Sequence, residues 1–342
     1  MSDPTAHVTL ADVAMLAGVS LATASRALGT GHGRTVTPEL RARVHAAALE
    51  LNYSPNAHAQ AMRGTSSAIG LIVHDIADPF ASSVASGVMA AAAERGLIVT
   101  IASSGGDPDH EVRLMETLRR QRVTSVILAG SRFSADDSNR WLAEEAAGIR
   151  AAGGRVALIG RRQFPASVIE IDNYGGAADL ARSLWAQGYR SYLVLAGPDS
   201  LVTSEDRVAG FRDALAELGY QLPDENVISS MFSRDGGYAA MSAALDEGME
   251  AECLFAVNDV MAIGAIAALR DRGQSVPEDM AVAGFDDIPM LRDVLPALTT
   301  VRLPLVEIGR RAFELASTDA GPEGTCVAVR GDVVLRASTP AR

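Results

Sequence analysis

The chain has 342 residues, of which 48% are hydrophobic and 21% charged. This composition is typical of globular proteins, and at roughly 150 residues per domain it predicts two domains, or two and a small extra unit. No apolar run reaches the roughly 18–20 residues of a membrane span, and the first residues lack the basic start of a secretory signal. Two cysteines, Cys253 and Cys326, are too few for a disulfide framework and lack metal-ligand spacing. We expect a cytoplasmic protein with no metal site, no cofactor and no membrane partner.

Charge is distributed unevenly along the sequence. Residues 1–64 contain five arginines and four acidic residues, a net charge of +1, whereas the other 25 arginines and 38 acidic residues sum to −13. This asymmetry is expected where only the first segment meets a polyanion. The chain contains no lysine, so every basic contact must come from arginine. A coding bias toward arginine is the simpler explanation for the missing lysine.

Residues 1–53 are predicted to form a head of three short helices. Thr9 precedes the stretch LADVAMLAG, and Asp12 completes a capping pattern. Ser20 caps the next stretch, LATASRALG, after a tight turn, so the two helices form a helix-turn-helix unit. A third helix begins at Pro38, and its apolar stripe closes a three-helix core.

Residues 54–67, SPNAHAQAMRGTSS, are predicted to form a linker. The segment begins with Ser54 and Pro55 and ends with glycine and small polar residues. Its middle favours a helix of about two turns with almost no apolar face, and a helix that short is marginal in water alone. We expect it to become ordered only when another element holds it.

Residues 68–342 alternate between buried strands and helices, which predicts doubly wound α/β units in two lobes. We place the first lobe at about 68–165 and 303–318, and the second at about 166–287 and 320–340. Predicted strands are 68–75, 97–103, 124–130 and 155–160 in the first set, then 167–172, 191–197, 252–259 and 280–287 in the second. Ligands in such sheets bind beyond the carboxyl ends of the strands. Polar residues at those ends are Asp75, Asn258, Asp259, Asp286 and Asp287.

Several motifs resemble the lactose-repressor (LacI/GalR) family of bacterial transcription regulators. They are VTLADVAMLAGVSLATASRAL, LNYSPNAHAQAMRG, IGLIVHDIADPF, RVAGFRDAL, NDVMAIGAIAAL, VPEDMAVAGFDDIP and LTTVRLPLVEIGRRA, in the order of the family and across essentially the whole chain. The resemblance implies a helix-turn-helix head, a hinge helix and a periplasmic-binding-protein-like body. It implies a regulator, most simply a repressor, that binds a pseudo-palindromic operator as a homodimer.

The resemblance also implies which residues contact double-stranded DNA. Arg26 on the second helix has the geometry to contact guanine, and Leu21 and Ala22 to contact thymine methyl groups in the major groove. A surface ion pair of Arg26 and partial burial of Leu21 are the alternatives. The complete implied set is Thr9, Ser20, Leu21, Ala22, Thr23, Ser25, Arg26, Tyr53, Asn56, Ala59 and Met62.

Met62 occupies the position at which relatives insert an apolar side chain into the minor groove from the paired linker helices. An exposed Met62 in a loose tether is the alternative. The loop after the second helix, GTGHGRTVT, is longer and richer in glycine than the resemblance leads us to expect. Two alternatives remain for this loop: either His32 or Arg34 contacts phosphate, or the loop is only a loose connection without a contact to DNA.

An effector cleft between the lobes is implied as well. A sugar needs paired donors and acceptors for its hydroxyls and a flat apolar surface, and the matching residues are Asp75, Phe80, Arg207, Phe232, Asn258 and Asp286. Phe80 belongs to the core in the alternative interpretation, and Asp259 and Asp287 are expected to cap helices. Arg132, Arg161 and Arg162 either face the cleft and favour an acidic ligand, or pair with acids.

Ligand binding controls DNA binding only if it favours one arrangement of the lobes. The resemblance implies that this arrangement sets the spacing of the two linkers. A bilobal sugar-transport protein is the alternative class, but it has no use for residues 1–64. An enzyme is not expected, because the sequence has no P-loop, no GxSxG and no HExxH motif.

Overall fold

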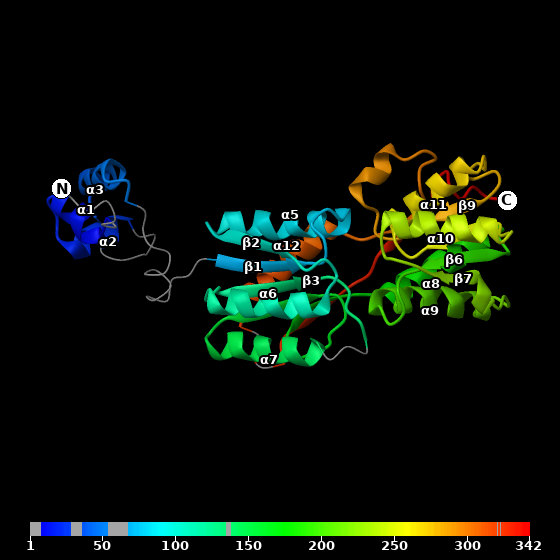
Figure 1. Cartoon of the computed structure of the whole chain (residues 1–342), viewed down its shortest axis with the longest axis horizontal. Helices are drawn as coiled ribbons and strands as arrows, with labels where there is room; N and C mark the ends of the chain where they lie inside the picture. The colour runs from blue at the N-terminus through cyan, green and yellow to red at the C-terminus, as the bar shows by residue number, and fades with distance from the viewer. Residues whose placement is uncertain (1–7, 29–35, 54–67, 135–137, 320, 322) are drawn as a thin grey trace. The chain divides into compact units, whose positions relative to one another are not determined.

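The computed structural model describes residues 8–28, 36–53, 68–134, 138–319, 321 and 323–342, and Figure 1 shows its elements along the chain. The chain divides into two compact units, Met1–Ser66 and Ser67–Arg342. The shorter unit is called the head and the longer unit the body.

Within its described residues the head contains three helices, α1 (Leu10–Leu16), α2 (Leu21–Leu28) and α3 (Pro38–Glu50). At the start of α1 the Thr9 hydroxyl accepts from the Asp12 amide, and the Asp12 carboxylate accepts from the Thr9 amide at 2.8 Å. Helices α1 and α2 are bent by 103° relative to each other, as in a helix-turn-helix unit. The predicted helical head is therefore confirmed.

No single helix in the described ranges is long and apolar enough to cross a membrane, and α1 and α2 meet such a test only when they are joined across their bend.

Small side chains form the core of the head. Alanines at the contacts let the three helices approach closely. The buried core residues are Val13, Ala14, Ala17, Ala24, Ala27, Val44, Ala47 and Ala48. Arg43 of α3 also holds the end of α1, because its Nε donates to the Ala17 carbonyl at 2.8 Å.

The first lobe of the body is a parallel sheet in the order β11-β5-β4-β3-β1-β2. Its strands are β1 (Ala68–Val73), β2 (Ile98–Ser103), β3 (Ser125–Ala129), β4 (Arg155–Ile159), β5 (Ser167–Ile171) and β11 (Cys326–Val329). Helices α5 (Pro79–Glu94) and α12 (Leu305–Ser317) cover one face, and α6 (Pro108–Arg120) and α7 (Ser138–Ala151) cover the other (Figure 1). The central strands are almost wholly buried, as expected for parallel strands covered on both faces.

The second lobe is a parallel sheet in the order β7-β6-β8-β9. Its strands are β6 (Tyr192–Ala196), β7 (Val227–Ser229), β8 (Cys253–Ala256) and β9 (Ala281–Ala283). Helix α8 (Asn173–Ala186) packs against α9 (Val202–Glu217), and α10 (Arg234–Asp246) against α11 (Asp259–Asp271). The lobe also contains η1 (Asp224–Asn226), η2 (Pro289–Asp293) and the antiparallel pair β10 (Thr300–Arg302) and β12 (Asp332–Val334).

Buried aromatic rings form the centre of the second lobe. Phe211 and Phe255 are stacked with 4.6 Å between ring centroids, and Tyr192 meets Phe211 edge-on at 5.6 Å. All three side chains are fully buried. Each ring removes a large apolar area from water, so this cluster stabilises the lobe strongly.

Helices α5 and α12 cross at glycines. A Cβ on Gly87 would collide with the Val306 carbonyl, and one on Gly309 would collide with the Val84 carbonyl. The two backbones are therefore in direct contact, and larger residues at either glycine would force the helices apart.

The structure confirms a doubly wound α/β body but corrects the sheet to which one strand belongs. We predicted that residues 167–172 open the second lobe, and this is wrong, because β5 pairs with β4 in the first sheet. Residues 326–329, which we placed in the second lobe, form β11 and pair with β5. The local pattern identifies a buried strand, whereas its sheet is decided by long-range pairing.

The chain crosses between the two lobes three times. The crossings lie between β5 and α8, between β10 and α12, and between β11 and β12. Helix α8 packs against α9, whereas α12 packs against α5 and strands of the first sheet. Each crossing is short, with one or two residues between the elements that it joins.

Candidate functional site

Helix α2 presents an exposed face that extends from its first residue to its last turn. Leu21 is 54% exposed, and Ala22 and Arg26 are also exposed. The Arg26 Nε donates to the Ala22 carbonyl at 2.9 Å, and in the described part of the chain no carboxylate pairs with its guanidinium. The alternative of an ion pair for Arg26 is therefore not seen there, whereas Leu21 is exposed over only about half of its surface.

The hydroxyl groups near this face already have partners. Ser20 caps α2, because its Oγ accepts from the Thr23 amide at 3.2 Å and lies 2.9 Å from the Thr23 hydroxyl. The Thr9 hydroxyl donates to its capping carboxylate at 2.7 Å. Ser25 is half-buried, and Tyr53 packs against the head core. These groups therefore fix the shape of the head whether or not they contact DNA.

Three of the predicted DNA contacts, Asn56, Ala59 and Met62, lie outside the described residues, as do His32 and Arg34 of the glycine-rich loop.

A cavity of about 650 Å³ lies between the lobes of the body, at the carboxyl ends of the parallel strands. Both lobes contribute to its lining, which includes several large apolar side chains. Five residues predicted from the sequence line it, namely Asp75, Phe80, Arg207, Phe232 and Asp286. Phe133, Met231 and Met290 add apolar surface that the sequence analysis did not identify.

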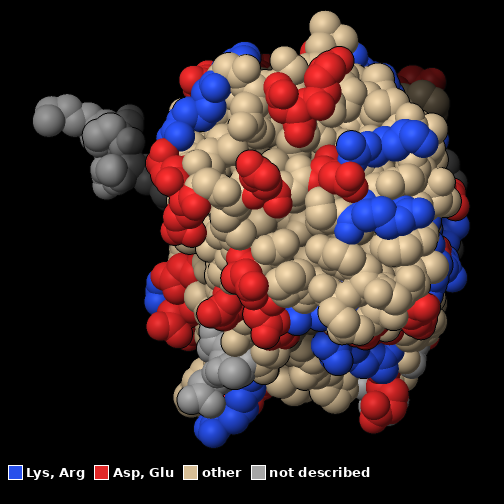
Figure 2. Space-filling view, turned by 90° about the vertical axis from the view of Figure 1, so that its right-hand side faces the viewer, with Lys and Arg blue, Asp and Glu red and all other residues tan. Residues whose placement is uncertain are grey.

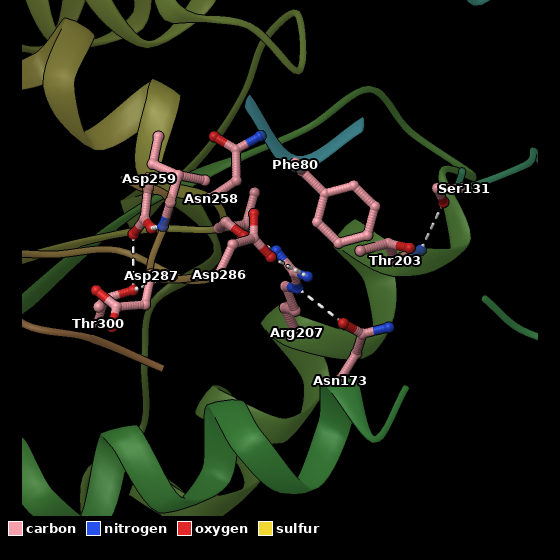
Figure 3. Close-up of polar contacts among 12 residues, drawn as sticks. Phe80, Ser131, Asn173, Thr203, Arg207, Asn258, Asp259, Asp286, Asp287 and Thr300 are labelled. Atoms are coloured by element: carbon pink, nitrogen blue, oxygen red, sulfur yellow. Dashed lines mark hydrogen bonds and ion pairs between the residues drawn. The ribbon is translucent and has the colours of Figure 1, made fainter. Parts of the chain in front are cut away.

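Arg207 is the central polar residue of this cavity, and only 2% of it is exposed. Its guanidinium donates to Asn173 Oδ1 at 2.9 Å, to the Val257 carbonyl at 2.6 Å and to Asp286 Oδ1 at 2.8 Å. Figure 3 shows the contacts with Asn173 and Asp286. The guanidinium carbon also lies 3.7 Å from the centroid of the Phe285 ring. Arg207 is therefore fixed in place before any ligand binds.

Asp286 is held in an unusual backbone conformation, with φ of 117°. Such an angle is uncommon for a residue other than glycine and is found where the surrounding structure holds it. Burial raises the pKa of Asp286 to about 6, while the Arg207 charge and hydrogen bond oppose the rise. Beyond its bond to Arg207, its carboxylate has acceptor capacity to offer to a ligand hydroxyl.

Three sequence predictions at the strand ends need correction. Asn258 does not line the cavity; it caps α11, because its Oδ1 accepts from the Met261 amide at 2.8 Å. Asp259 does not cap α11; its carboxylate accepts from the Ile288 amide and the Thr300 hydroxyl. The Asp259–Thr300 contact is drawn in Figure 3.

The prediction that Asp287 caps a helix is also wrong. Its carboxylate pairs with Arg302 at 2.6 Å and with Arg336 at 2.7 Å. Burial raises the pKa of Asp259, and the nearby Asp286 charge raises it further. Asp259 therefore supports the loop that carries Asp286 and stays outside the lining.

The first lobe contributes a polar wall from the loop after β1. Asp78 caps α5, because its Oδ1 accepts from the Phe80 amide at 2.9 Å. Burial raises the pKa of Asp78, and the neighbouring Asp75 charge adds to this. His74 is half-buried at the start of the same loop, and desolvation lowers its pKa so that the neutral ring is favoured.

Sequence reasoning missed His74, Asp78, Ser131, Asn173 and Thr203, all of which line the cavity. Each lies just after a strand or at the start of the helix that follows it. Ligands in such sheets bind beyond the carboxyl ends of the strands, so these positions follow from the correct placement of the strands. Asn173 follows the strand predicted at 167–172 and begins α8, so the same rule points to it in either sheet. The Thr203 amide donates to Ser131 Oγ at 2.9 Å and so connects the two lobes (Figure 3).

The three arginines that follow first-lobe strands do not line this cavity. Arg132 is bound by Glu111 at 2.8 Å, and both side chains are 5% exposed. Arg161 pairs with Asp206 at 3.5 Å, and Arg162 donates to the Glu323 carbonyl at 3.0 Å. The alternative in which these arginines pair with acids therefore describes Arg132 and Arg161, whereas Arg162 binds a backbone carbonyl.

Surface charge in the body is mixed. The end of the second lobe drawn in Figure 2 shows arginines interspersed among many acidic side chains. A surface of this kind repels a polyanion as readily as it attracts one.

A helix-turn-helix head and a bilobal body with a cavity between the lobes define the class of ligand-binding DNA-binding proteins. Comparisons with known proteins agree. Residues 9–56 match the model "Bacterial regulatory proteins, lacI family", and residues 181–339 match "Periplasmic binding protein-like domain". The chain is 34% identical over 311 residues to the HTH-type transcriptional regulator GalR of Escherichia coli, covering 90% of this chain and 88% of GalR.

Solved structures are similar over nearly the whole chain. The complex of the transcriptional regulator CelR with cellobiose has a TM-score of 0.70 and 30% identity, covering 97% of this chain and 99% of that one. The Lac repressor dimer bound to operator and the anti-inducer ONPF has a TM-score of 0.80 and 27% identity, covering 98% and 100%. This chain belongs to the LacI family and is a DNA-binding transcriptional regulator, and its homologues are regulators rather than enzymes.

Proposed function

We propose that this regulator binds a pseudo-palindromic operator through its head and that a sugar or sugar derivative in the cavity controls this binding. The exposed Arg26 on α2, with Leu21 and Ala22 beside it, is the observation that carries the DNA-binding part. A guanidinium donates two parallel hydrogen bonds to guanine O6 and N7, and an exposed leucine suits a thymine methyl. Thr9, Ser20, Thr23, Ser25 and Tyr53 are proposed to orient the head on phosphates.

The linker completes the proposed interface. Asn56, Ala59 and Met62 are assigned to phosphate and minor-groove contacts, with Met62 as the apolar wedge. Met62→Ala is expected to weaken operator binding while ligand affinity stays unchanged. Equal operator affinity of this variant and the unchanged protein would refute the wedge.

The effector part rests on the fixed Arg207–Asp286–Asn173 group beside aromatic side chains. Asp286 accepts from a sugar hydroxyl, the Asn173 amide donates to one, and Phe80 and Phe232 pack against the apolar face of the ring. Asp75 and Asp78 offer acceptors from the first lobe. The ligand is bound and released without chemical change. CelR, which is similar to this chain, has a solved structure in complex with cellobiose.

Homodimer formation is proposed on the first lobe. Ile98 on the edge strand β2 is 75% exposed, and Met89 on the neighbouring helix α5 is 44% exposed. An exposed apolar edge of this kind is stable when a second copy covers it. The Lac repressor, whose structure is similar, is a dimer on its operator. Ile98→Glu is expected to yield monomers in light scattering, whereas Trp141→Glu, at an exposed site on α7, should leave the dimer intact.

The test of the whole proposal begins with selection of bound fragments from random duplex DNA by the full chain. A two-fold symmetric consensus is expected, and Arg26→Ala should lower affinity for it by about ten- to a hundredfold. A sugar panel added to the same gel-shift assay should then change affinity for the consensus. A chain that selects no symmetric sequence would contradict the proposed operator, and a panel without effect would contradict the sugar effector.

A further inference from the structure

The charges that line the cavity decide which ligands it accepts. Its charged lining residues are Asp75, Asp78, Asp286, Arg207 and Arg234. An anionic sugar, such as a sugar acid or sugar phosphate, needs an available cation or unoccupied amide donors in this lining.

Each lining arginine already contacts a carboxylate. Arg207 already donates to three acceptors and is neutralised by Asp286. Arg234 pairs with Asp235 at 2.8 Å and lies over the Tyr238 ring, with 5.4 Å between the guanidinium carbon and the centroid. Each positive charge is thus matched by a carboxylate in direct contact.

Two lining carboxylates have no such match. Asp75 Oδ1 accepts from the Ala77 amide, and Asp78 Oδ1 from the Phe80 amide, each at 2.9 Å. No basic side chain of the described residues forms an ion pair with either carboxylate. Desolvation and the Asp75 charge raise the pKa of Asp78, and Asp78 in turn raises that of Asp286. The lining therefore carries surplus negative charge.

Several helix N-termini at the cavity already have an amide that is bound by another group of the protein. Helices α5, α9 and α10 all begin there, and a helix N-terminus commonly binds anions through unoccupied amides. Here Asp78 occupies an amide of α5, and the Ser233 hydroxyl accepts from the Gly236 amide of α10 at 3.1 Å. In α9 the Val202 amide donates to the Arg132 carbonyl at 3.1 Å, and the Thr203 amide donates to Ser131.

We propose that the effector is a carbohydrate without negative charge, either a neutral polyol or an amino sugar, and that sugar acids and sugar phosphates are rejected. The inference rests on the proposed function, because it specifies the ligand of the same cavity. Rejection follows from the two unmatched carboxylates, which repel an anion bound in the same cavity. An amino sugar would place its ammonium beside Asp75 and Asp78.

The test uses the full chain and matched sugars in thermal-shift and calorimetric titrations. Each neutral sugar, among them glucose, galactose, ribose and cellobiose, is compared with its aldonic acid, its phosphate ester and, where one exists, its 2-amino derivative. The neutral or amino member of at least one series is expected to bind at least tenfold more tightly than its anionic partners.

Two variants assign the selectivity to the carboxylates. The double variant Asp75→Asn/Asp78→Asn keeps both side-chain oxygens that accept from backbone amides, because asparagine caps as aspartate does. It should improve binding of the anionic partner by about tenfold and bring it closer to the neutral sugar. Asp319→Asn is the matched control, since Asp319 accepts from the Gly321 amide in a similar turn outside the cavity. This control should leave the selectivity unchanged.

The outcomes separate this inference from the proposed function. A sugar acid or phosphate that binds the unchanged chain as tightly as its neutral partner overturns the inference while a sugar effector stands. Equal selectivity of the double variant and the control also overturns it. A panel in which no carbohydrate of any charge binds contradicts the sugar effector and the inference together, whereas operator selection by the head is unaffected.

Discussion

The head and the body are stabilised by different means. The described core of the head contains two valines and six alanines, whereas the second lobe is centred on Tyr192, Phe211 and Phe255. Hydrophobic stabilisation scales with buried apolar area, at about 25 cal/mol per Å², so each head residue contributes little. The close fit of its small side chains and the caps at its helix ends therefore matter more in the head.

Charge is also handled differently in the two units. The body buries two ion pairs, Arg207–Asp286 and Arg132–Glu111, whereas Arg26 of the head is exposed. An arginine fixed by buried partners selects a ligand by geometry, and an exposed arginine is available to a polyanion. The comparison suggests four substitutions, and the largest effect is expected in the body.

Arg207→Ala should lower the free energy of unfolding of the body by about 3–5 kcal/mol, because Asp286 loses its buried partner. Calorimetry on the full chain measures this change. Arg212→Ala removes an exposed pair with Asp224 and should cost less than about 1 kcal/mol. The double variant Arg207→Met/Asp286→Asn should be less destabilised than Arg207→Ala, and the opposite order would show that the charge is not the cause.

Ala24→Leu should destabilise the head by about 1–3 kcal/mol, since Ala24 has no exposed surface and the core has no space for three added carbons. Operator affinity should fall while the thermal transition of the body stays in place. Ala11→Leu, at an exposed position of α1, is the control and should have little effect. Unchanged operator binding by Ala24→Leu would mean that the head core tolerates expansion.

His74 makes the stability of the body depend on pH. Burial lowers its pKa below the usual value of 6.5, so the unfolded chain binds the proton more readily than the folded chain. The contribution of His74 is fully present above pH 6.5 and is lost as the pH falls, by at most about 1.4 kcal/mol per unit.

Asp286 acts in the opposite direction. Its pKa is raised in the folded chain, so the folded chain binds a proton more readily than the unfolded chain and gains stability as the pH falls. The effect of His74 is therefore measured as the difference between the unchanged chain and His74→Gln in denaturant titrations from pH 7.5 to 5. The variant should lose less stability over this range. Parallel curves would contradict a neutral, half-buried His74.

Thr9→Ala should cost the head about 1 kcal/mol, the smallest effect of the four, because it removes the hydroxyl that caps α1. Thr9→Ser keeps the hydroxyl and should restore most of the loss. Hydrogen exchange of amides in α1 measures both. Equal exchange in the two variants would show that the capping box contributes nothing to the head.

Local signals in the sequence predicted the elements of the fold well. Thr9 with Asp12, Ser20 and Pro38 mark helix starts, and each acts as predicted in the structure. These signals succeed because a cap or a proline acts within one helical turn. We assigned β5 to the wrong sheet, because strand pairing joins residues that are distant in sequence. No local pattern in the sequence records such pairing.

The candidate site was predictable only in part for the same reason. Arg207 and Asp286 were identified through resemblance, but the sequence does not reveal that they bind each other across 79 positions of the chain. The side chain of Asn258 suits a ligand contact, but its position just before α11 also suits a helix cap. In the structure Asn258 caps α11. His74 and Asp78 adjoin predicted residues, yet only the folded loop shows that they line the cavity.

The three crossings between the lobes have a consequence for how the body can be divided. Residues of β5, α12 and β11 complete the first lobe from positions spread over more than half of the body's sequence. No single cut in the gene therefore yields either lobe as an independent product. A protease nick at one crossing would leave two fragments that stay associated until a denaturant separates them.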